Sequence, residues 1–327
     1  MPSTRSAHAI VIAASFLATS SAGAAVFDDG GTTIINSTVN DFIEVSDGPG
    51  GLPTTVIFEP GANITQADSV GDSVFATGNS SVIVNGGQFV EDVTGLDDSS
   101  ITVNGGTLGD DLLGFTNATL VMTGGSVADD AEIYDTGSFV VSGGVVGEDL
   151  EAFDDSSLTF SGGTVNNNLT AEQNATIVMT GGSVGNDLES VDDASVTVRG
   201  GSIAADIEAA NAGTIDIFGG ELGTSTGFAP LLASGGDSVI TLYGPEFQIN
   251  GSPVAFGNIG NVFGTLSGTL SDGSTFQRGF FRVNEGSSSA PNRGEIVLVQ
   301  QAIPEPVASL GGLIGLGLLV ARRQRCH

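Results

Sequence analysis

The stretch GGVVGEDLEAFDDSSLTFS, residues 143–161, is one unit of a repeat that organises the chain. The Gly-Gly pair that opens it recurs every 19 residues without an insertion. The eight pairs are Gly86-Gly87, Gly105-Gly106, Gly124-Gly125, Gly143-Gly144, Gly162-Gly163, Gly181-Gly182, Gly200-Gly201 and Gly219-Gly220. A fixed period of this size is typical of a solenoid, in which each unit buries its apolar face only against its neighbours.

Apolar residues keep fixed places in the unit when the first glycine is counted as place 1. Place 4 is apolar in all eight units and place 8 in the seven regular ones, while places 16 and 18 alternate with polar or β-branched neighbours. This two-residue alternation predicts a strand with one buried face, and no helical stripe is present. We expect three short strands per unit, around places 15–19, 3–5 and 8–10. The glycine pair, polar places 5–7 and the Asp/Asn/Ser-rich places 11–14 would form the corners.

The pattern predicts an all-β fold, a single-stranded parallel β-helix (β-solenoid) with 19-residue coils. Successive coils would stack at the strand spacing of roughly 4.8 Å. We expect a right-handed coil by analogy, because left-handed coils built from three hexapeptides have about 18 residues. Beyond the repeats, Asp272-Gly273 between two apolar runs predicts a hairpin in a closing β cap.

The composition excludes several kinds of chemistry. All eight basic residues are arginines, and the formal net charge is −30. The only histidines, His8 and His327, and the only cysteine, Cys326, lie in terminal segments that we expect to be removed. The remaining body then lacks Cys, His and Lys, which excludes disulfides, Cys/His zinc sites, Ser-His-Asp or Cys-His catalysis and P-loops. The strongly negative charge also predicts that the protein does not bind nucleic acid.

Acidic residues recur at place 7 of the unit. If the coils stack in register, six aspartates and one asparagine form a column with neighbours roughly 5 Å apart: Asp92, Asp111, Asp130, Asp149, Asn168, Asp187 and Asp206. A second acidic set occupies the third corner: Asp97/Asp98, Asp135, Asp154/Asp155 and Asp192/Asp193. Two interpretations stay open. In the first, the aspartates are turn residues that bond to nearby backbone; in the second, the column binds Ca²⁺, which prefers carboxylate oxygens. The pattern requires no cofactor.

The first 24 residues have the features of a secretory signal peptide. Arg5 is a basic residue near the start, Ala9 to Ala18 is a short apolar run, and Ala22-Gly23-Ala24 precedes the expected cut before Ala25. Residues 25–85 follow the same strand-and-turn pattern less regularly, and we expect an N-terminal cap with irregular coils there. We expect the regular β-helix over 86–262 and the C-terminal β cap with a linker over 263–303.

Three elements follow one another at the C-terminus: Pro304-Glu305-Pro306, a largely apolar run from Val307 to Ala321, and the basic residues Arg322, Arg323 and Arg325. In this order they resemble the PEP-CTERM sorting signal over 304–327. The resemblance implies a Gram-negative bacterium, transient anchoring in the inner membrane through a C-terminal helix, and recognition by an exosortase. It also implies release to the outer surface or an exopolysaccharide matrix. The apolar run is shorter than the ~17–25 residues usual for a membrane span.

The repeats are similar in period and glycine placement to those of AIDA-type autotransporter passengers. No translocator barrel follows them, which argues against self-export by that route.

The sequence thus predicts an exported, non-enzymatic structural or adhesive component of the cell surface or exopolysaccharide matrix. One alternative is a polysaccharide-modifying β-helix enzyme, a lyase or hydrolase. The acids recur uniformly, however, whereas a catalytic pair should be a local exception. A second is a calcium-dependent glycan-binding module, and a third is a recognition surface of outward residues such as Thr102, Thr159 and Thr197. The mixture of Val, Met and Asp in those columns argues against a regular array. The glycan, protein partner and assembly state are not specified by the sequence.

Overall fold

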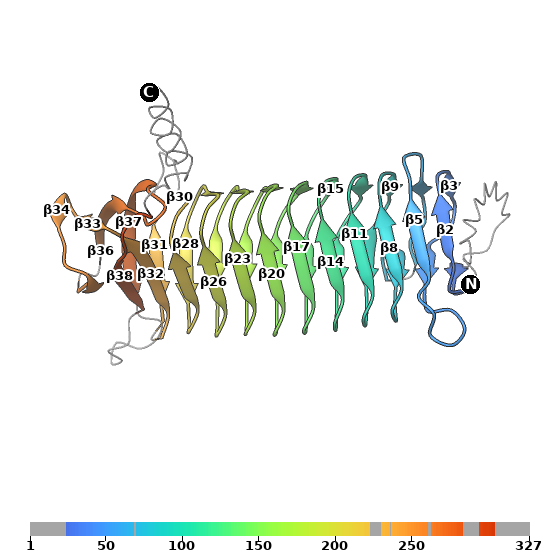
Figure 1. Cartoon of the computed structure of the whole chain (residues 1–327), viewed down its shortest axis with the longest axis horizontal. Helices are drawn as coiled ribbons and strands as arrows, with labels where there is room; N and C mark the ends of the chain where they lie inside the picture. The colour runs from blue at the N-terminus through green and yellow to red at the C-terminus, as the bar shows by residue number, and fades with distance from the viewer. Residues whose placement is uncertain are drawn as a thin grey trace, which may run out of the picture.

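The structure, a computed structural model, describes residues 24–304 except 69, 223–229, 236, 261–262 and 284–293. Over these residues the protein is all-β, without a helix, and forms a parallel β-solenoid of about 10 turns. Figure 1 shows the coils stacked along one straight rod, with the first strands at one end and the antiparallel strands at the other. The predicted fold class is therefore confirmed in its main feature, the β-solenoid.

Each coil contributes one strand to each of three sheets. Sheet A contains, in spatial order, β2 (Thr32–Ile35), β5 (Thr55–Phe58), β8 (Ser81–Val84), β11 (Ser100–Val103), β14 (Thr119–Met122), β17 (Ser138–Val141), β20 (Ser157–Phe160), β23 (Thr176–Met179), β26 (Ser195–Val198), β29 (Thr214–Ile217), β32 (Val239–Gly244), β38 (Glu295–Gln300) and β35 (Gly257–Asn258). Sheet C contains β3 (Thr38–Val39), β6 (Asn63–Ile64), β9 (Gln88–Phe89), β12 (Thr107–Leu108), β15 (Ser126–Val127), β18 (Val145–Val146), β21 (Thr164–Val165), β24 (Ser183–Val184), β27 (Ser202–Ile203) and β30 (Glu221–Leu222).

Sheet B lies along the third side of the rod and ends in the cap. It contains β1 (Ala25–Phe27), β4 (Ile43–Val45), β7 (Asp72–Ala76), β10 (Asp92–Gly95), β13 (Leu112–Gly114), β16 (Ala131–Ile133), β19 (Leu150–Ala152), β22 (Leu169–Ala171), β25 (Leu188–Ser190), β28 (Ile207–Ala210), β31 (Leu231–Ser234), β37 (Thr275–Val283), β36 (Phe263–Thr269), β33 (Glu246–Ile249) and β34 (Ser252–Pro253).

The strands of a regular coil fall where the apolar pattern predicts them. In the coil around Gly143, they are β17 at places 15–18, β18 at places 3–4 and β19 at places 8–10. Corresponding residues of successive coils pair in parallel without an offset, as Ser138 pairs with Ser157 and Leu150 with Leu169. Like side chains therefore lie in columns along the rod.

The core consists of the inward columns of all three sheets. Places 16 and 18 of sheet A, place 4 of sheet C and place 8 of sheet B point inward, as Leu158, Phe160, Val165 and Leu169 do, each at most 1% exposed. Burial of such side chains is worth roughly 1.5–3 kcal/mol each. Met122 and Met179 also belong to the inward column of sheet A and are fully buried. The sequence-based view that methionine interrupts the outward Ser/Thr columns is wrong, because strand alternation sends place 18 to the core.

The two glycines of each pair are needed for different reasons. The second has a positive φ in every pair, for example +95° at Gly144, a conformation that costs other residues energy. The first lies against the coil before it, because a Cβ at Gly143 would come within 2.5 Å of the carbonyl oxygen of Thr123. The corner therefore excludes side chains on grounds of both conformation and stacking.

The ends of the rod depart from the regular coil. Before residue 86, β2, β3 and β4 form one coil and β5, β6 and β7 another, joined by longer connections. After β32, β33, β36 and β37 pair antiparallel, so the parallel order changes near residue 246, inside the range 86–262 expected for coils. The predicted hairpin at Asp272-Gly273 is confirmed by the antiparallel pairing of β36 with β37. β37 and β38 also continue sheets B and A in parallel with β31 and β32.

Arg278 of β37 fastens this cap to the last strand of sheet C. Its Nε donates to the carbonyl oxygen of Leu222 at 2.8 Å, and its Nη2 donates to that of Ala205 at 2.5 Å. In the regular coils the carbonyl oxygen of the residue at place 4 instead accepts a hydrogen bond from a backbone N–H of the next coil. The carbonyl oxygen of Val184, for example, accepts from the N–H of Ala204. The guanidinium group, 4% exposed, thus replaces a backbone donor where the coils end.

We predict that Gly143→Ala and Gly144→Ala each destabilise the protein by about 1–3 kcal/mol, the first through a clash with the preceding coil and the second through its positive φ. Thermal unfolding measures the effect. Gly279→Ala is the matched control, because a Cβ there would meet no atom within 4 Å. Similar losses in all three variants would contradict this account of the corner.

Candidate functional site

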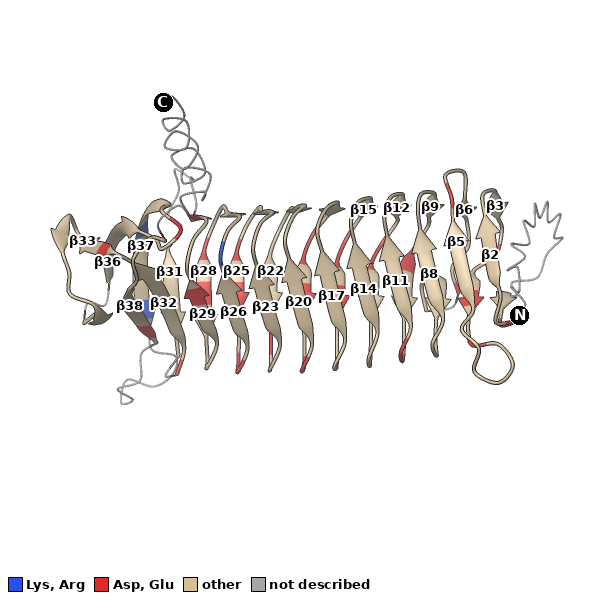
Figure 2. Cartoon of the chain, viewed as in Figure 1, with Lys and Arg blue, Asp and Glu red and all other residues tan. Residues whose placement is uncertain are grey.

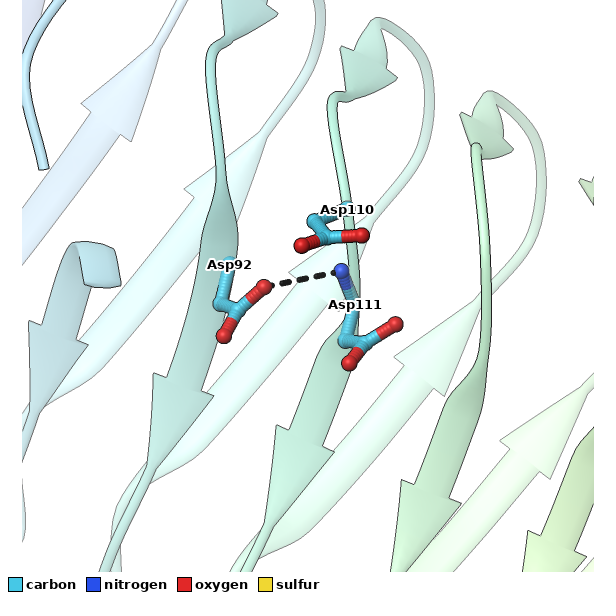
Figure 3. Close-up of side chains that lie close together, drawn as sticks. All are labelled: Asp92, Asp110 and Asp111. Carbon is cyan, nitrogen blue, oxygen red and sulfur yellow. Dashed lines mark hydrogen bonds between the residues drawn. The ribbon is translucent and has the colours of Figure 1, made fainter. Parts of the chain in front are cut away.

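The predicted aspartate column is a hydrogen-bonded ladder at the edge of sheet B. The side chain of each member accepts the backbone N–H of the next member, one coil further along. The N–Oδ1 distances are 3.0 Å for Asp111 to Asp92, 2.9 Å for Asp130 to Asp111, 2.8 Å for Asp149 to Asp130, 2.7 Å for Asn168 to Asp149, 3.1 Å for Asp187 to Asn168 and 2.7 Å for Asp206 to Asp187. Figure 3 shows the first of these bonds. These side chains bond to the backbone of a neighbouring coil rather than to their own turn.

Two positions show what the ladder requires. Asn168 occupies the column with a neutral amide, and its Oδ1 accepts the N–H of Asp187 as a carboxylate would. The role in the ladder therefore needs an acceptor oxygen and no charge. After Asp206 the column reaches Pro230, because Ile207 pairs with Leu231. Proline has no N–H to donate, so the ladder ends there.

The column also brings carboxylates of neighbouring places together. One oxygen from each of Asp92, Asp110 and Asp111 lies within 4.8 Å of the others, and the same holds for Asp111, Asp129 and Asp130. Figure 3 shows the first triplet, contributed by two successive coils. Three carboxylates at such distances are a partial ligand set for Ca²⁺, which takes 6–8 oxygens. The predicted residues Asp149, Asp187 and Asp206 belong to none of the carboxylate triplets found among the described residues.

Partial burial, together with neighbouring negative charges, raises the pKa of several ladder carboxyls. The pKa of Asp111 is raised to about 6, chiefly by partial burial and then by the negative charges of Asp92 and Asp110, against the lowering effect of the Asp130 N–H. Partial burial also raises the pKa values of Asp92, Asp130 and Asp206. The column is therefore an environment in which protons or cations relieve repulsion.

A third cluster lies on the outward face of sheet B and was not predicted from the sequence. Glu132 of β16 pairs with Glu151 of β19, and their carboxyl groups cluster with that of Asp130. Burial, followed by a hydrogen bond to Glu132 and its charge, raises the pKa of Glu151 to about 8. Tyr134 donates its hydroxyl to Oε2 of Glu132 at 2.9 Å. At neutral pH the carboxyl group of Glu151 therefore favours its protonated form.

Tyr134 is also the middle ring of an aromatic stack beside this cluster. The ring centroids of Phe115 and Tyr134, and of Tyr134 and Phe153, are each 4.7 Å apart, and the planes are nearly parallel. The repeat places these three residues in one column at place 11, and residues 110, 129, 132 and 151 also keep fixed places. Aligning the units by place could have found both sets, whereas the raised pKa of Glu151 depends on burial that the sequence does not show.

The second acidic set occupies the third corner as turn residues. Asp97, Asp135, Asp154 and Asp192 have φ between 55° and 59°, in the left-handed region that Asp and Asn tolerate better than most residues. Thr116, Gln173 and Asn211 occupy the same place with similar φ. Their side chains also link coils, as Asp154 Oδ2 accepts the N–H of Asp135 at 3.2 Å. Backbone conformation therefore accounts for these aspartates.

Most of the predicted targeting residues lie outside the described residues. Pro304 is described, whereas Glu305, Pro306, Arg322, Arg323 and Arg325, together with residues 1–23 of the expected signal peptide, are not. A search of the described residues finds no helix with the length and apolar character to span a membrane.

We predict that Asp149→Ala lowers the stability by about 1–3 kcal/mol, because the N–H of Asn168 loses its acceptor. Asp149→Asn should leave stability nearly unchanged, since Asn168 already fills the same role. Thermal melts of the two variants test this. An equal loss in both would show that the charge, rather than the acceptor oxygen, matters.

Calcium binding by the column stays a prediction, and the triplets make it testable. If Asp92, Asp110 and Asp111 bind Ca²⁺, millimolar calcium raises the melting temperature and a chelator lowers it. Asp110→Asn should reduce the calcium-induced shift while keeping the ladder, because Asp110 accepts no ladder bond through its side chain. An unchanged melting temperature at millimolar Ca²⁺ would leave these residues a structural role only.

Stability should also depend on pH in a defined direction. The folded-state pKa values of Asp111, about 6, and Glu151, about 8, lie above their ordinary values of 3.8 and 4.5. Folding therefore takes up protons, so their contribution is most favourable below about pH 4 and is lost as the pH rises to about 8. We expect a higher melting temperature at pH 5 than at pH 8.5. Glu151→Gln should flatten the curve above pH 6, and a curve parallel to that of the unmodified protein would contradict this assignment.

Comparison with known proteins does not assign this chain to a family. No family model, no curated protein and no solved structure matches the chain. The description of the fold and of the carboxylate clusters therefore depends on the residues of this chain alone, and so does any function inferred from them.

Proposed function

We propose that this protein is an exported, acidic β-solenoid that serves as a structural or adhesive component of a bacterial surface or exopolysaccharide matrix, without catalytic activity. The observation that carries the proposal is the unbroken ladder from Asp92 to Asp206. One side-chain oxygen of each member from Asp92 to Asp187 accepts the backbone N–H of the next coil, so the most conspicuous acidic feature of the chain strengthens the rod. A rod of self-similar coils is a suitable spacer or scaffold.

The proposed route to the surface depends on the chain termini. We infer that residues 1–24 direct export and that an exosortase recognises Pro304, Glu305 and Pro306 together with the arginines at 322, 323 and 325. The C-terminal segment would hold the chain in the inner membrane before processing. The net charge of −30 supports partners other than nucleic acid. We also keep the right-handed coil as part of this proposal.

One specific observation favours an alternative, a polysaccharide-modifying enzyme or a calcium-dependent glycan-binding module. The cluster of Asp130, Glu132 and Glu151 is a local exception among the carboxylate clusters of the described residues, and the pKa of Glu151 is raised to about 8 there, first by burial. The stacked rings of Phe115, Tyr134 and Phe153 lie beside it. A paired acid and carboxylate is the arrangement used in glycoside hydrolysis, and aromatic rings provide apolar faces for sugars.

A single experiment with two measurements separates these functions. The protein is located in cell fractions with an antibody, and the purified chain is incubated with acidic and neutral polysaccharides to measure new reducing ends and unsaturated products. We expect surface or matrix localisation and no cleavage. Cleavage that disappears in Glu151→Gln, but persists in the matched variant Glu189→Gln, would replace the structural proposal with the enzymatic one. Recovery of the chain from the cytoplasm would contradict the export route.

A further inference from the structure

The outward side of sheet A lacks charge over most of the rod. We define the uncharged face as the outward residues of β5, β8, β11, β14, β17, β20, β23 and β26 at places 15 and 17. Place 15 carries only Ser or Thr: Thr55, Ser81, Ser100, Thr119, Ser138, Ser157, Thr176 and Ser195. Place 17 carries only β-branched residues: Ile57, Ile83, Thr102, Val121, Val140, Thr159, Val178 and Thr197. In a chain with a net charge of −30, sixteen consecutive uncharged outward positions form a distinct surface.

Sheet B and the corners beside it are acidic, whereas the outward residues of sheet C at place 3, from Gln88 to Ser202, are uncharged like those of sheet A. Sheet A has the longer strands, four residues against two, and therefore the wider uncharged side. Sheet B carries outward Glu132, Glu151, Glu189 and Glu208, and the corners on either side of it carry the aspartate sets. Figure 2 shows this contrast: the broad arrows of sheet A from β8 to β23 are tan, whereas red residues gather at the bends and on strands behind them. Two such rods repel each other along their acidic sides and can approach closely only through an uncharged one.

The two rims of the uncharged face differ in charge. The rim after the strands, at place 19, begins with Glu59 after β5, is polar and neutral from Asn85 to Thr180, and ends in the cation Arg199 after β26. The rim before each strand, at place 13, includes the exposed carboxylates Asp98, Asp155 and Asp193. One rim therefore offers donors and a cation, and the other offers acceptors.

We propose that the uncharged face binds the same face of a second copy of this chain. A two-fold axis parallel to the rod would keep the two rods parallel, while the strands of the two facing sheets would run in opposite directions. The place-19 residue that follows each strand would then lie opposite the place-13 residue that precedes the same strand in the partner. Arg199 would then lie opposite Asp193, Asn104 opposite Asp98, and Ser161 opposite Asp155. A two-fold axis perpendicular to the rods would instead bring acidic rims together, Asp98 facing Asp155, which is unfavourable.

The size of the face fits a reversible dimer. Eight strands at the usual spacing span about 38 Å, and five residues of a strand span about 16 Å, which gives roughly 600 Å² per copy. The total of about 1,200 Å² lies at the lower end of specific interfaces. Its centre is apolar enough to exclude water, since the side chain of Val140 is 40% exposed in the single chain. We therefore expect association in the micromolar range rather than a permanent complex.

A glycan fits this surface less well. Sugar-binding surfaces commonly offer aromatic rings with polar groups around them, and the uncharged face has no aromatic side chain. The stack of Phe115, Tyr134 and Phe153 follows sheet B instead, and Phe218 and Tyr243 lie beyond β26. A second copy, whose rims would place donors or a cation opposite Asp98, Asp155 and Asp193, is the occupant that these residues favour. This inference does not depend on export or on a role in a matrix.

The first test measures self-association of the full-length chain by analytical ultracentrifugation over a range of concentrations. We expect a concentration-dependent dimer and at least a tenfold weaker association for Val140→Asp, which places a carboxylate at the centre of the face. Val145→Asp is the matched control, because Val145 is 39% exposed and lies on sheet C. Equal behaviour of the two variants, or a monomer at all concentrations up to about 100 μM, a range well above the expected micromolar association, would overturn the proposal.

A charge exchange tests the arrangement. Arg199→Glu and Asp193→Arg should each weaken the dimer severalfold, by placing like charges opposite each other, and the double variant should restore association. Circular dichroism melts confirm that each variant is folded. A double variant no better than the single ones would reject the parallel two-fold arrangement. Binding to a polysaccharide that Val140→Asp abolishes in a chain that remains monomeric would identify a glycan as the occupant and overturn the dimer.

Discussion

The constraint on which the structure depends is the zero-offset pairing of each coil with the next. Every strand of the regular coils pairs with the strand 19 residues further on, as Ser157 pairs with Thr176 and Leu169 with Leu188. A single inserted residue within a strand would turn its inward side chains outward, because side chains alternate along a strand. Longer connections before β8 lie at corners, and the one insertion inside a strand among the described coils, at Ser73 of β7, shifts the register against Asp92 and Val93 of β10. The same pairing makes each residue a neighbour of its own equivalents.

This pairing creates a charge problem that the repeat solves in two ways. Carboxylates in a column are neighbours by construction, and like charges opposite each other are unfavourable. At place 7 the repulsion is offset because each carboxylate accepts a backbone N–H, and Asn168 divides the run of charges. At place 9 the neutral Thr170 separates the pair Glu132 and Glu151 from the pair Glu189 and Glu208. Glutamates thus occur there as two pairs rather than as an unbroken column of charges.

Much of this fold is predictable because every unit repeats the same local information. The glycine pairs mark the period, and the alternation at places 16 and 18 identifies the strand whose side chains fill the core. The cap follows from contacts that no repeat encodes: β37 and β38 resume the parallel sheets after antiparallel strands, and Arg278 replaces a backbone donor for Leu222. The spacing of the aspartates predicts which residues form the ladder. It does not predict that their side chains bond to the backbone of the following coil, because a turn residue and a ladder residue have the same sequence pattern.

Uniformity also bears on how chemistry could arise on such a rod. A catalytic group must differ in proton affinity or surroundings from its equivalents, and zero-offset pairing tends to give equivalents the same surroundings. Glu151 is an exception because its two neighbours in the column differ. Glu132, which accepts the hydroxyl of Tyr134, lies on one side, and Thr170 lies on the other. The pKa of Glu151 is raised first by burial and then by the hydrogen bond to Glu132 and the charge of that residue. The neutral columns of sheet A show the opposite case, in which equivalent residues combine into one continuous surface whose properties depend on all coils together.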